Sequence, residues 1–327
     1  VARSVASECS KKSFKIHYPL LVASAYSGFV IWHMGFSSSA ALFVATPGHL
    51  LEDRVGIIPV TETILSSTNI VLALMALAII TIICPLMRPK DKDIIEFTPN
   101  TIDNIDNSAS DNQSELTLIE KFENHRALNI FLGFALVSYI VVTYTQNGFS
   151  LNLNIVSWTF LAFGLILAAS PMHFIKLINN AAATVGPIIL QYPFYSGIMG
   201  MMATTGLMKV ITDWIISIST PETLGFFAFL SGGLVNMFIP SGGGQWAVQG
   251  PIMIEAALSL NVNPSVVVLG VAYGDQWSNM IQPFWTIPIL AIAGLHMRQI
   301  LGYTFVIFIM TGFLYGGGIL YMGSGNI

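Results

Sequence analysis

Two short stretches of the sequence place hydroxyls, amides and flexible backbone among apolar residues. GFSSSA begins at Gly35, and FIPSGGGQWAVQGP begins at Phe238. Irregular backbone at membrane depth survives only where it is buried in protein or lines a wet cavity. Free N–H groups and helix N-termini there attract an anion, whereas carbonyl, hydroxyl and amide oxygens can coordinate a small cation. The two stretches therefore predict a site for a small ion or an anionic ligand.

Two titratable residues lie close to these stretches. His33 precedes the first one, and the ordinary pKa of histidine suits proton coupling or pairing with a carboxylate. Asp275, in AYGDQWSNM, is a carboxyl group within an apolar segment, which is expensive and therefore a functional candidate. The alternatives stay open: His33 can be a structural histidine bonded to a carbonyl, and Asp275 can lie at the water interface.

Hydroxyl and amide pairs occur at two further positions, Thr68-Asn69 and Ser278-Asn279. Neutral oxygens of this kind suit sodium, so we expect a Na⁺ site at Asn69 and Asn279. The alternative is ordinary helix capping. Asn236 flanks the second stretch, either as a coupling residue or as a support for the local geometry. The residues expected to take part in ion coupling are His33, Thr68, Asn69, Asn236, Asp275, Ser278 and Asn279.

An internal repeat relates the two stretches. At an offset of 204 residues, Ser27-Gly28 matches Ser231-Gly232 without gaps, and the later matches are Ser37 with Ser241, Val44 with Val248 and Pro47 with Pro251. Paired interruptions in two hydrophobic halves indicate the binding site of a secondary transporter. Close packing of glycines between membrane helices is the alternative.

The elements that position these residues are membrane helices. The chain has 327 residues, of which 54% are hydrophobic and 9% charged, whereas soluble domains carry about 25% charged residues. A soluble protein is therefore excluded, and without a basic patch so is a nucleic-acid-binding protein. A spanning helix needs about 20 apolar residues. The clear candidates are 69–87, 127–145, 155–169, 185–205 and 302–321; shorter ones are 207–219, 224–240, 246–260, 264–272 and 283–295.

The hydrophilic segment 96–124 is predicted to be a linker outside the membrane. It separates a first repeat portion, 1–95, from a second repeat, 125–327. We expect a hairpin around 18–52 and a broken helix around 57–87 in the first portion, and a hairpin around 224–260 and a broken helix around 264–295 in the second. Because the chain begins with Val1 and a polar stretch, we expect further helices upstream.

Three stretches resemble the short-chain fatty acid transporter family: HYPLLVASAYSGFVIWHMGFSSSAALFVATPGH, FLSGGLVNMFIPSGGGQWAVQGP and YGDQWSNMIQPFW. The resemblance covers nearly the whole chain except the linker. It implies an all-α integral membrane protein of the ion-transporter superfamily, a polytopic helix bundle with two inverted repeats. Each repeat would contain a re-entrant hairpin and a broken helix.

The resemblance also implies a multi-pass carrier of the bacterial cytoplasmic membrane. Its substrates would be acetoacetate, butyrate and similar monocarboxylates, driven by H⁺ or Na⁺. A short carboxylate needs donors for two oxygens and a small apolar pocket, for which Trp246, Phe284 and Trp285 are suitable walls. The residues expected to bind substrate are Ser37, Ser38, Ser39, Ser241, Gly242, Gly243, Gly244, Gln245, Trp246 and Gln249.

Two other functions stay open. A membrane hydrolase or acyltransferase could use Ser241 as its nucleophile, although no G-x-S-x-G elbow is present. A receptor that binds a carboxylate without moving it is the other alternative. We expect no enzyme activity and no cofactor beyond the coupling ion. The expected partners are the monocarboxylate and the lipid bilayer, and a homodimer is left open.

Overall fold

The structure is a computed structural model that describes residues 1–97, 125–148 and 151–325. Most of the predicted linker, 98–124, lies outside these residues. The chain divides into two compact units, the first formed by Val1–Phe97 with Gln191–Ile327 and the second by Thr98–Leu190. The repeat boundaries, 1–95 and 125–327, stay a prediction.

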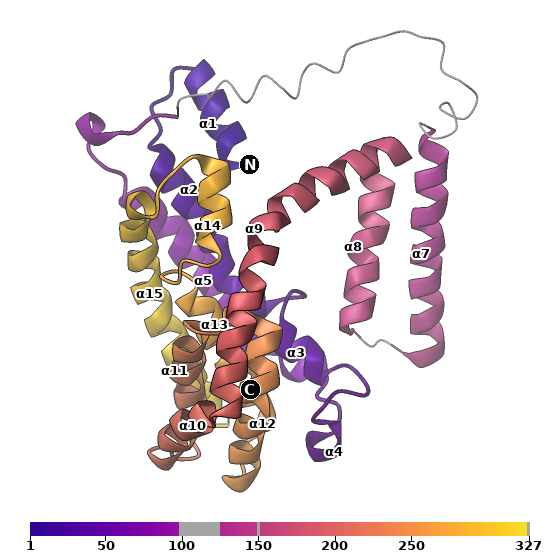
Figure 1. Ribbon diagram of the computed structural model, residues 1–327, viewed down its shortest axis with the longest axis vertical. Helices are drawn as coiled ribbons and strands as arrows, with labels where there is room; N and C mark the ends of the chain where they lie inside the picture. The colour runs from indigo at the N-terminus through magenta and orange to yellow at the C-terminus, as the bar shows by residue number, and fades with distance from the viewer. Residues whose placement is uncertain (98–124, 149–150, 326–327) are drawn as a thin grey trace. The chain divides into compact units, whose positions relative to one another are not determined.

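Every regular element in the described part of the chain is a helix, as the composition predicts (Figure 1). Four segments there are long and apolar enough to cross a membrane: Tyr18–Val44, Ser67–Leu86, Arg126–Gln146 and Met297–Gly323. Three of them match predicted spans, 69–87, 127–145 and 302–321. The predicted span 155–169 corresponds to a shorter helix, Leu153–Leu167. The coarse fold class, a helical multi-pass membrane protein, is confirmed.

The first part of the first unit is built from short helical pieces. After α1 (Ala2–Lys11), the apolar segment is divided into α2 (Tyr18–Ser27), the 3₁₀ helix η1 (Gly28–Met34) and α3 (Ser39–Val44). The interruption between η1 and α3 falls on the predicted Ser-rich stretch. The remaining elements are α4 (Glu52–Val55), η2 (Val60–Glu62), the long helix α5 (Ser67–Leu86) and η3 (Asp91–Asp93).

The second part of this unit repeats the alternation of helix and interruption. Helix α10 (Leu207–Ser217) is followed by α11 (Leu224–Asn236) and α12 (Gly242–Ser259). Helix α13 (Pro264–Ser278) is followed by α14 (Thr286–Ala293) and the long α15 (Met297–Gly323). The breaks at 237–241 and 279–285 therefore lie where the sequence indicated interrupted segments.

The glycine triplet differs from the sequence-based expectation. Gly242, Gly243 and Gly244 form the first turn of α12, whereas the irregular backbone ends at Ser241. The hydroxyl of Ser241 caps the helix by accepting a hydrogen bond from the Gly244 N–H at 3.3 Å. Similarly, α13 continues past residue 272, so that Asp275 lies in its last turn.

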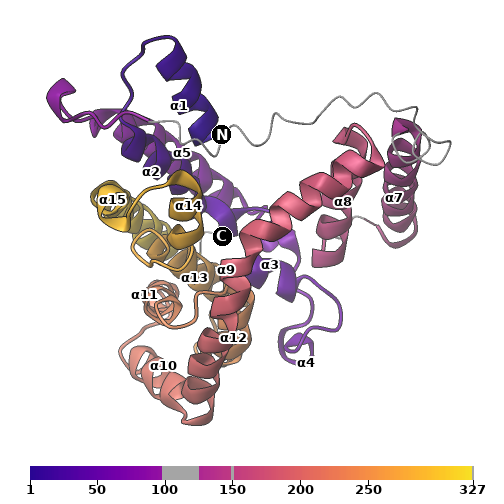
Figure 2. The ribbon, with the colours of Figure 1, turned by 45° about the horizontal axis from the view of Figure 1, so that its top comes forward.

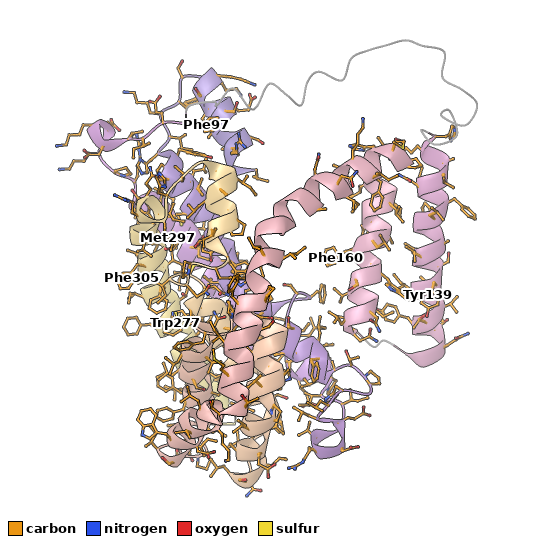
Figure 3. The ribbon with its side chains drawn as sticks, viewed as in Figure 1. Phe97, Tyr139, Phe160, Trp277, Met297 and Phe305 are labelled. Atoms are coloured by element: carbon orange, nitrogen blue, oxygen red, sulfur yellow. The ribbon has the colours of Figure 1, made fainter. Side chains whose placement is uncertain are left out.

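Helices α11 and α13 lie side by side in the first unit (Figure 2), and they pack against each other through small residues. A Cβ on Gly232 would lie 2.8 Å from the carbonyl oxygen of Val271. Glycine is required there because the two backbones approach closely. Beside this contact, Trp277, labelled in Figure 3, stacks on Phe308 with ring centroids 4.1 Å apart. The pair joins α13 to α15.

The second unit contains α7 (Arg126–Asn147), α8 (Leu153–Leu167) and the beginning of α9 (Pro171–Thr204). Helices α7 and α8 pack together, and Tyr139 and Trp158 hold them with ring centroids 4.6 Å apart. Several side chains on the outside of this pair are apolar, among them Phe160 at 67% exposed. Such a surface is expected for helices that face lipid.

Candidate functional site

The two interrupted stretches meet inside the first unit. A Cβ on Gly242 would lie 2.6 Å from His33 Nε2 and 2.8 Å from the ring of Trp32. A Cβ on the next glycine, Gly243, would lie 3.8 Å from Ser39 Cβ, which is ordinary contact. The N-terminus of α12 therefore lies against the last residues of η1 and the start of α3. Ser39 and Gly243, which are 204 residues apart in the proposed repeat, are therefore neighbours.

His33 is the residue at the centre of this contact, with 1% of its surface exposed. Its ring atom Nδ1 lies 3.3 Å from Ser38 Oγ, and Ser38 in turn caps α3 by accepting from the Ala41 N–H. The backbone N–H of His33 donates to Gln276 Oε1 at 2.9 Å. The ring is therefore held on one side by α3, while the residue's backbone is held by α13.

Asp275 faces the other side of the imidazole. Its Oδ2 lies 3.5 Å from His33 Nε2, and only 2% of its surface is exposed. The second carboxylate oxygen, Oδ1, accepts a hydrogen bond from Asn279 Nδ2 at 3.3 Å. Asp275 is thus fully inside the protein, and the interface alternative considered from sequence does not describe its surroundings. The two titratable residues singled out in the sequence form one buried pair.

Several buried polar atoms around this pair lack a hydrogen-bond partner. Buried polar groups are normally paired, so such a concentration needs an explanation. Among the described side chains of the first unit, the atoms without a hydrogen bond are the indole nitrogens of Trp32 and Trp246, His33 Nε2, Asn236 Oδ1, Gln245 Oε1, Asp275 Oδ2 and Gln276 Nε2. The set contains both donors and acceptors, and most of it belongs to predicted site residues or their immediate neighbours.

Gln245 and Gln249 lie on the first turns of α12 and are completely buried. Gln245 Nε2 donates to Gly232 O at 2.8 Å and to Gln249 Oε1 at 3.1 Å. Gln249 Nε2 donates to Ser231 Oγ at 2.8 Å. These bonds tie α12 to α11, so both glutamines hold the two arms around the break at 237–241.

Asn69 lies in the first turn of α5, and both polar atoms of its side-chain amide have hydrogen-bond partners. Its Nδ2 donates to Met34 O at 3.0 Å and to Ile64 O at 2.7 Å. Its Oδ1 accepts a hydrogen bond from the hydroxyl of Tyr273 at 2.7 Å. Asn69 therefore links the start of α5 to the end of η1 and to α13.

Asn236 and Asn279 form a second amide network, at the ends of α11 and α13. Asn236 Nδ2 lies 2.9 Å from both Ser278 Oγ and Asn279 Oδ1. The backbone carbonyl of Asn279 accepts a hydrogen bond from Tyr26 at 2.7 Å. As a result, each of the two asparagines proposed for sodium already accepts at its side-chain oxygen. Their role in binding a cation stays a prediction.

Some predicted residues lie at the edge of the site. Ser37 is exposed and donates to the carbonyl of Trp32, and Thr68 is half-buried at the start of α5. Trp246 is buried, but its ring lies against Gly250 of its own helix. Trp285 lies near Phe29, with ring centroids 5.8 Å apart, and Phe29 stacks on Trp32 at 5.4 Å.

Two cavities of the first unit lie away from the predicted residues. One, of about 570 Å³, is lined by residues that include Leu51, Ile252 and the ion pair of Arg54 with Glu255. The other, of about 550 Å³, is lined by residues that include His17, Leu20 and Cys84. None of the predicted substrate-binding residues lines either cavity.

Sequence reasoning missed four contributors: Trp32, Gln276, Tyr26 and Tyr273. Gln276 had a signal, because it adjoins Asp275 in an apolar segment. The tyrosines had none, because an aromatic residue in a membrane helix is usually part of the packing. Only the fold shows that the hydroxyls of Tyr26 and Tyr273 bond to the asparagines of the other half of the chain.

The helices define a multi-pass membrane protein, and its first unit contains a buried polar site. The family model described as "Short chain fatty acid transporter" matches residues 1–322. The chain therefore belongs to the short-chain fatty acid transporter family. The resemblance seen in the three sequence stretches is confirmed.

Two curated bacterial relatives are both described as "Putative short-chain fatty acid transporter". The protein of Escherichia coli is 37% identical over 298 residues, which cover 91% of this chain and 68% of the relative. The protein of Haemophilus influenzae is 35% identical over 329 residues, covering 98% of this chain and 74% of the relative. No solved structure matches the chain.

Proposed function

We propose that the protein is a secondary active transporter of short-chain monocarboxylates in the bacterial inner membrane. One observation carries this proposal: two interrupted segments from separate halves of the chain meet at a buried site with unpaired donors and acceptors. Irregular backbone buried at membrane depth is typical of carrier sites. In this reading the two pairs of interrupted segments are re-entrant hairpins and broken helices of two inverted repeats.

The substrate class follows from the charges at the site. Neither break contains Lys or Arg, so an anion would be met by His33, by backbone N–H groups of α12 and by the indole N–H of Trp32. One imidazolium and neutral donors suit a single carboxylate better than two or three. The aromatic row of Trp32, Phe29 and Trp285 supplies an apolar wall for a few methylene groups. Butyrate and acetoacetate fit this description.

Coupling to an ion requires groups that bind it only together with substrate. The buried pair of His33 and Asp275 supplies a proton site, and the oxygens of Asn69 and Asn279 supply neutral ligands for sodium. The transport proposal holds with either ion. The substrate would move by alternating access, in which the two repeats rearrange around the site at His33 and Asp275.

Exchange without any gradient tests the proposal. Proteoliposomes containing the full-length protein are loaded with unlabelled acetoacetate and diluted into labelled acetoacetate at equal pH and salt. We expect labelled acetoacetate to enter well above the level in protein-free liposomes. Unlabelled butyrate outside should compete, whereas succinate and citrate should not. Uptake equal to that of protein-free liposomes would overturn the proposal.

One arrangement favours a second candidate, a serine hydrolase. Ser38 Oγ, the His33 ring and Asp275 Oδ2 lie in series, at 3.3 Å and 3.5 Å. This is the order of a nucleophile, a base and an orienting acid. However, Ser38 is completely buried and its hydroxyl caps α3, so it is poorly placed to attack. A fluorophosphonate probe should leave Ser38 unlabelled, and labelling that Ser38→Ala abolishes would favour the hydrolase.

A further inference from the structure

We propose that the coupling ion is a proton, and that His33 exchanges its partner from Asp275 to the substrate carboxylate when Asp275 is protonated. The inference rests on the transport function proposed above. It begins from two atoms, His33 Nε2 and Asp275 Oδ2, which face each other at 3.5 Å and have no other partner. A separation of this size is too long for a strong hydrogen bond. The two groups are therefore close enough to form an ion pair, and their contact is weak enough for His33 to change its partner.

Among the described residues, His33 is the buried group at this site that can carry a positive charge for a substrate. A Cβ on Gly242 would lie 2.6 Å from Nε2, so the same edge of the ring faces both Asp275 and the N-terminal turn of α12. The first N–H groups of a helix lack intrahelical acceptors and favour a negative charge. The ring and the turn are in contact in this structure, so a carboxylate would enter between them only after they separate, and it would then receive donors from both. Asp275 and the substrate would then compete for one imidazolium.

Charge balance turns this competition into coupling. With His33 protonated and Asp275 ionised, the empty site is neutral. Adding one proton to Asp275 and one carboxylate to the site leaves it neutral again, because the imidazolium keeps its proton and now pairs with the substrate. Adding only the proton leaves a net charge of +1, and adding only the substrate leaves −1. An unbalanced buried charge is strongly unfavourable, so the half-loaded forms would not rearrange.

In the described helices packed against the pair, no other charged side chain is buried. Within the described residues, the elements packed against η1 and α13 are α2, α3, α5, α11, α12 and α15. Besides the pair itself, the buried titratable side chains of these helices and of α13 are the phenols of Tyr18, Tyr26, Tyr273 and Tyr315 and the thiol of Cys84. Tyr303 is half-buried. Their remaining titratable groups, Glu255, Arg298 and Tyr321, are exposed, and Glu255 is paired with Arg54.

The alternative ion, sodium, has weaker support in the contacts. Asn69 Oδ1 accepts from Tyr273, and Asn279 Oδ1 accepts from Asn236. The two oxygens also belong to separate networks, which hold α5 and α13 respectively. A sodium ion at either would first have to displace a hydrogen bond. Protonation of Asp275 requires only that Oδ2 give up its 3.5 Å contact with His33, because Oδ2 accepts no hydrogen bond.

Gradient-driven uptake of acetoacetate into proteoliposomes tests the inference. When the outside is about one pH unit more acidic than the inside, transport of one proton with each carboxylate gives at most about tenfold accumulation. We expect the pH gradient to drive accumulation when sodium is equal on both sides. A sodium gradient should drive no accumulation when the pH is equal on both sides. Protein-free liposomes give the passive entry of the undissociated acid, which is subtracted. Accumulation driven by sodium at equal pH would overturn the proton assignment.

Asp275→Asn separates coupling from binding, and Glu222→Gln is the matched control at an exposed carboxylate. We expect Asp275→Asn to lose accumulation entirely, while exchange falls by less than about tenfold and loses its pH dependence. Glu222→Gln should accumulate like the unmodified protein. Proton-driven accumulation by Asp275→Asn would overturn the inference. Absence of exchange in the unmodified protein would instead remove the transport function itself.

A second measurement needs no variant and so remains valid if Asp275→Asn does not fold. The half-saturating concentration of acetoacetate in exchange is measured over a series of equal inside and outside pH values. Because Asp275 must take up a proton before the carboxylate binds, this concentration should rise with pH, by up to about tenfold per unit. A half-saturating concentration that does not change with pH would contradict the inference.

Discussion

The imidazole of His33 and the carboxylate of Asp275 face each other at 3.5 Å, and each side chain has at most 2% of its surface exposed. One belongs to η1 in the first part of the chain and the other to the last turn of α13. The pair therefore joins two segments that the hydrophilic linker separates in sequence. The imidazole of this pair also lies against Gly242, in the N-terminal turn of α12.

Removing both members of this pair should destabilise the protein by less than the sum of the two single removals. Asp275→Ala or His33→Ala leaves its partner buried without compensation, which typically costs about 3–5 kcal/mol. The double variant, His33→Ala with Asp275→Ala, should be less destabilised than the sum of the two. Unfolding of the purified protein in detergent, followed by tryptophan fluorescence, measures the difference. Strictly additive effects would show that the two groups do not interact.

Gly242 and Gly243 offer a matched pair of substitutions on one helical turn. A Cβ at Gly242 would lie 2.6 Å from His33, whereas a Cβ at Gly243 would lie 3.8 Å from its nearest neighbour. We expect Gly242→Ala to displace the His33 ring, to cost about 1–3 kcal/mol and to lower exchange markedly. Gly243→Ala should keep both stability and exchange near the original values. Equal effects of the two changes would argue against close contact between the breaks.

Tyr273→Phe removes the hydroxyl that bonds to Asn69 Oδ1. The amide oxygen is then buried without this partner, so we expect a loss of about 1–3 kcal/mol of stability. Tyr139→Phe, at a half-exposed tyrosine of α7, is the control and should change the stability little. Thermal unfolding of both variants in the same detergent gives the comparison. A stable Tyr273→Phe protein would show that the bond is not important for holding α5 against α13.

His17 should make the protein sensitive to acid at the beginning of α2. Its Nδ1 accepts from the Ile95 N–H at 3.0 Å, and burial lowers the pKa of the imidazole below its ordinary value. A lowered pKa means that the folded state prefers the neutral ring. The stabilising contribution is therefore complete above about pH 6.5 and decreases as the pH falls below it.

The variant His17→Asn cannot take up a proton in this range. Its unfolding temperature should therefore depend less on pH between about 7 and 5 than that of the unmodified protein. The difference is measured by unfolding both proteins over that range in one buffer series. Parallel pH profiles would show that another group is responsible for the acid sensitivity.

Much of this arrangement was visible in the sequence. Composition predicted membrane helices, and the Ser- and Gly-rich stretches marked two interruptions that the structure contains at 35–38 and 237–241. The residue types of His33 and Asp275 marked them as candidates. What the sequence did not contain was their pairing, because nothing in the spacing of residues 33 and 275 indicates contact.

The glycine triplet shows a second limit of sequence reasoning. Three glycines have low helix propensity, so the sequence favoured irregular backbone at Gly242. In the structure the Ser241 cap and the buried bonds of Gln245 hold these residues in a helical turn. Tertiary contacts outweigh local propensity there, and the absence of side chains at Gly242 leaves room for His33.

The most direct test of the whole account is the gradient at which net transport stops. Acetoacetate flux through the reconstituted protein, corrected for protein-free liposomes, is measured at several pH gradients with sodium equal on both sides. If one proton moves with each carboxylate, the acetoacetate ratio that abolishes net flux should change by about tenfold per pH unit. A ratio that stays at one for every pH gradient would contradict proton-coupled transport through His33 and Asp275.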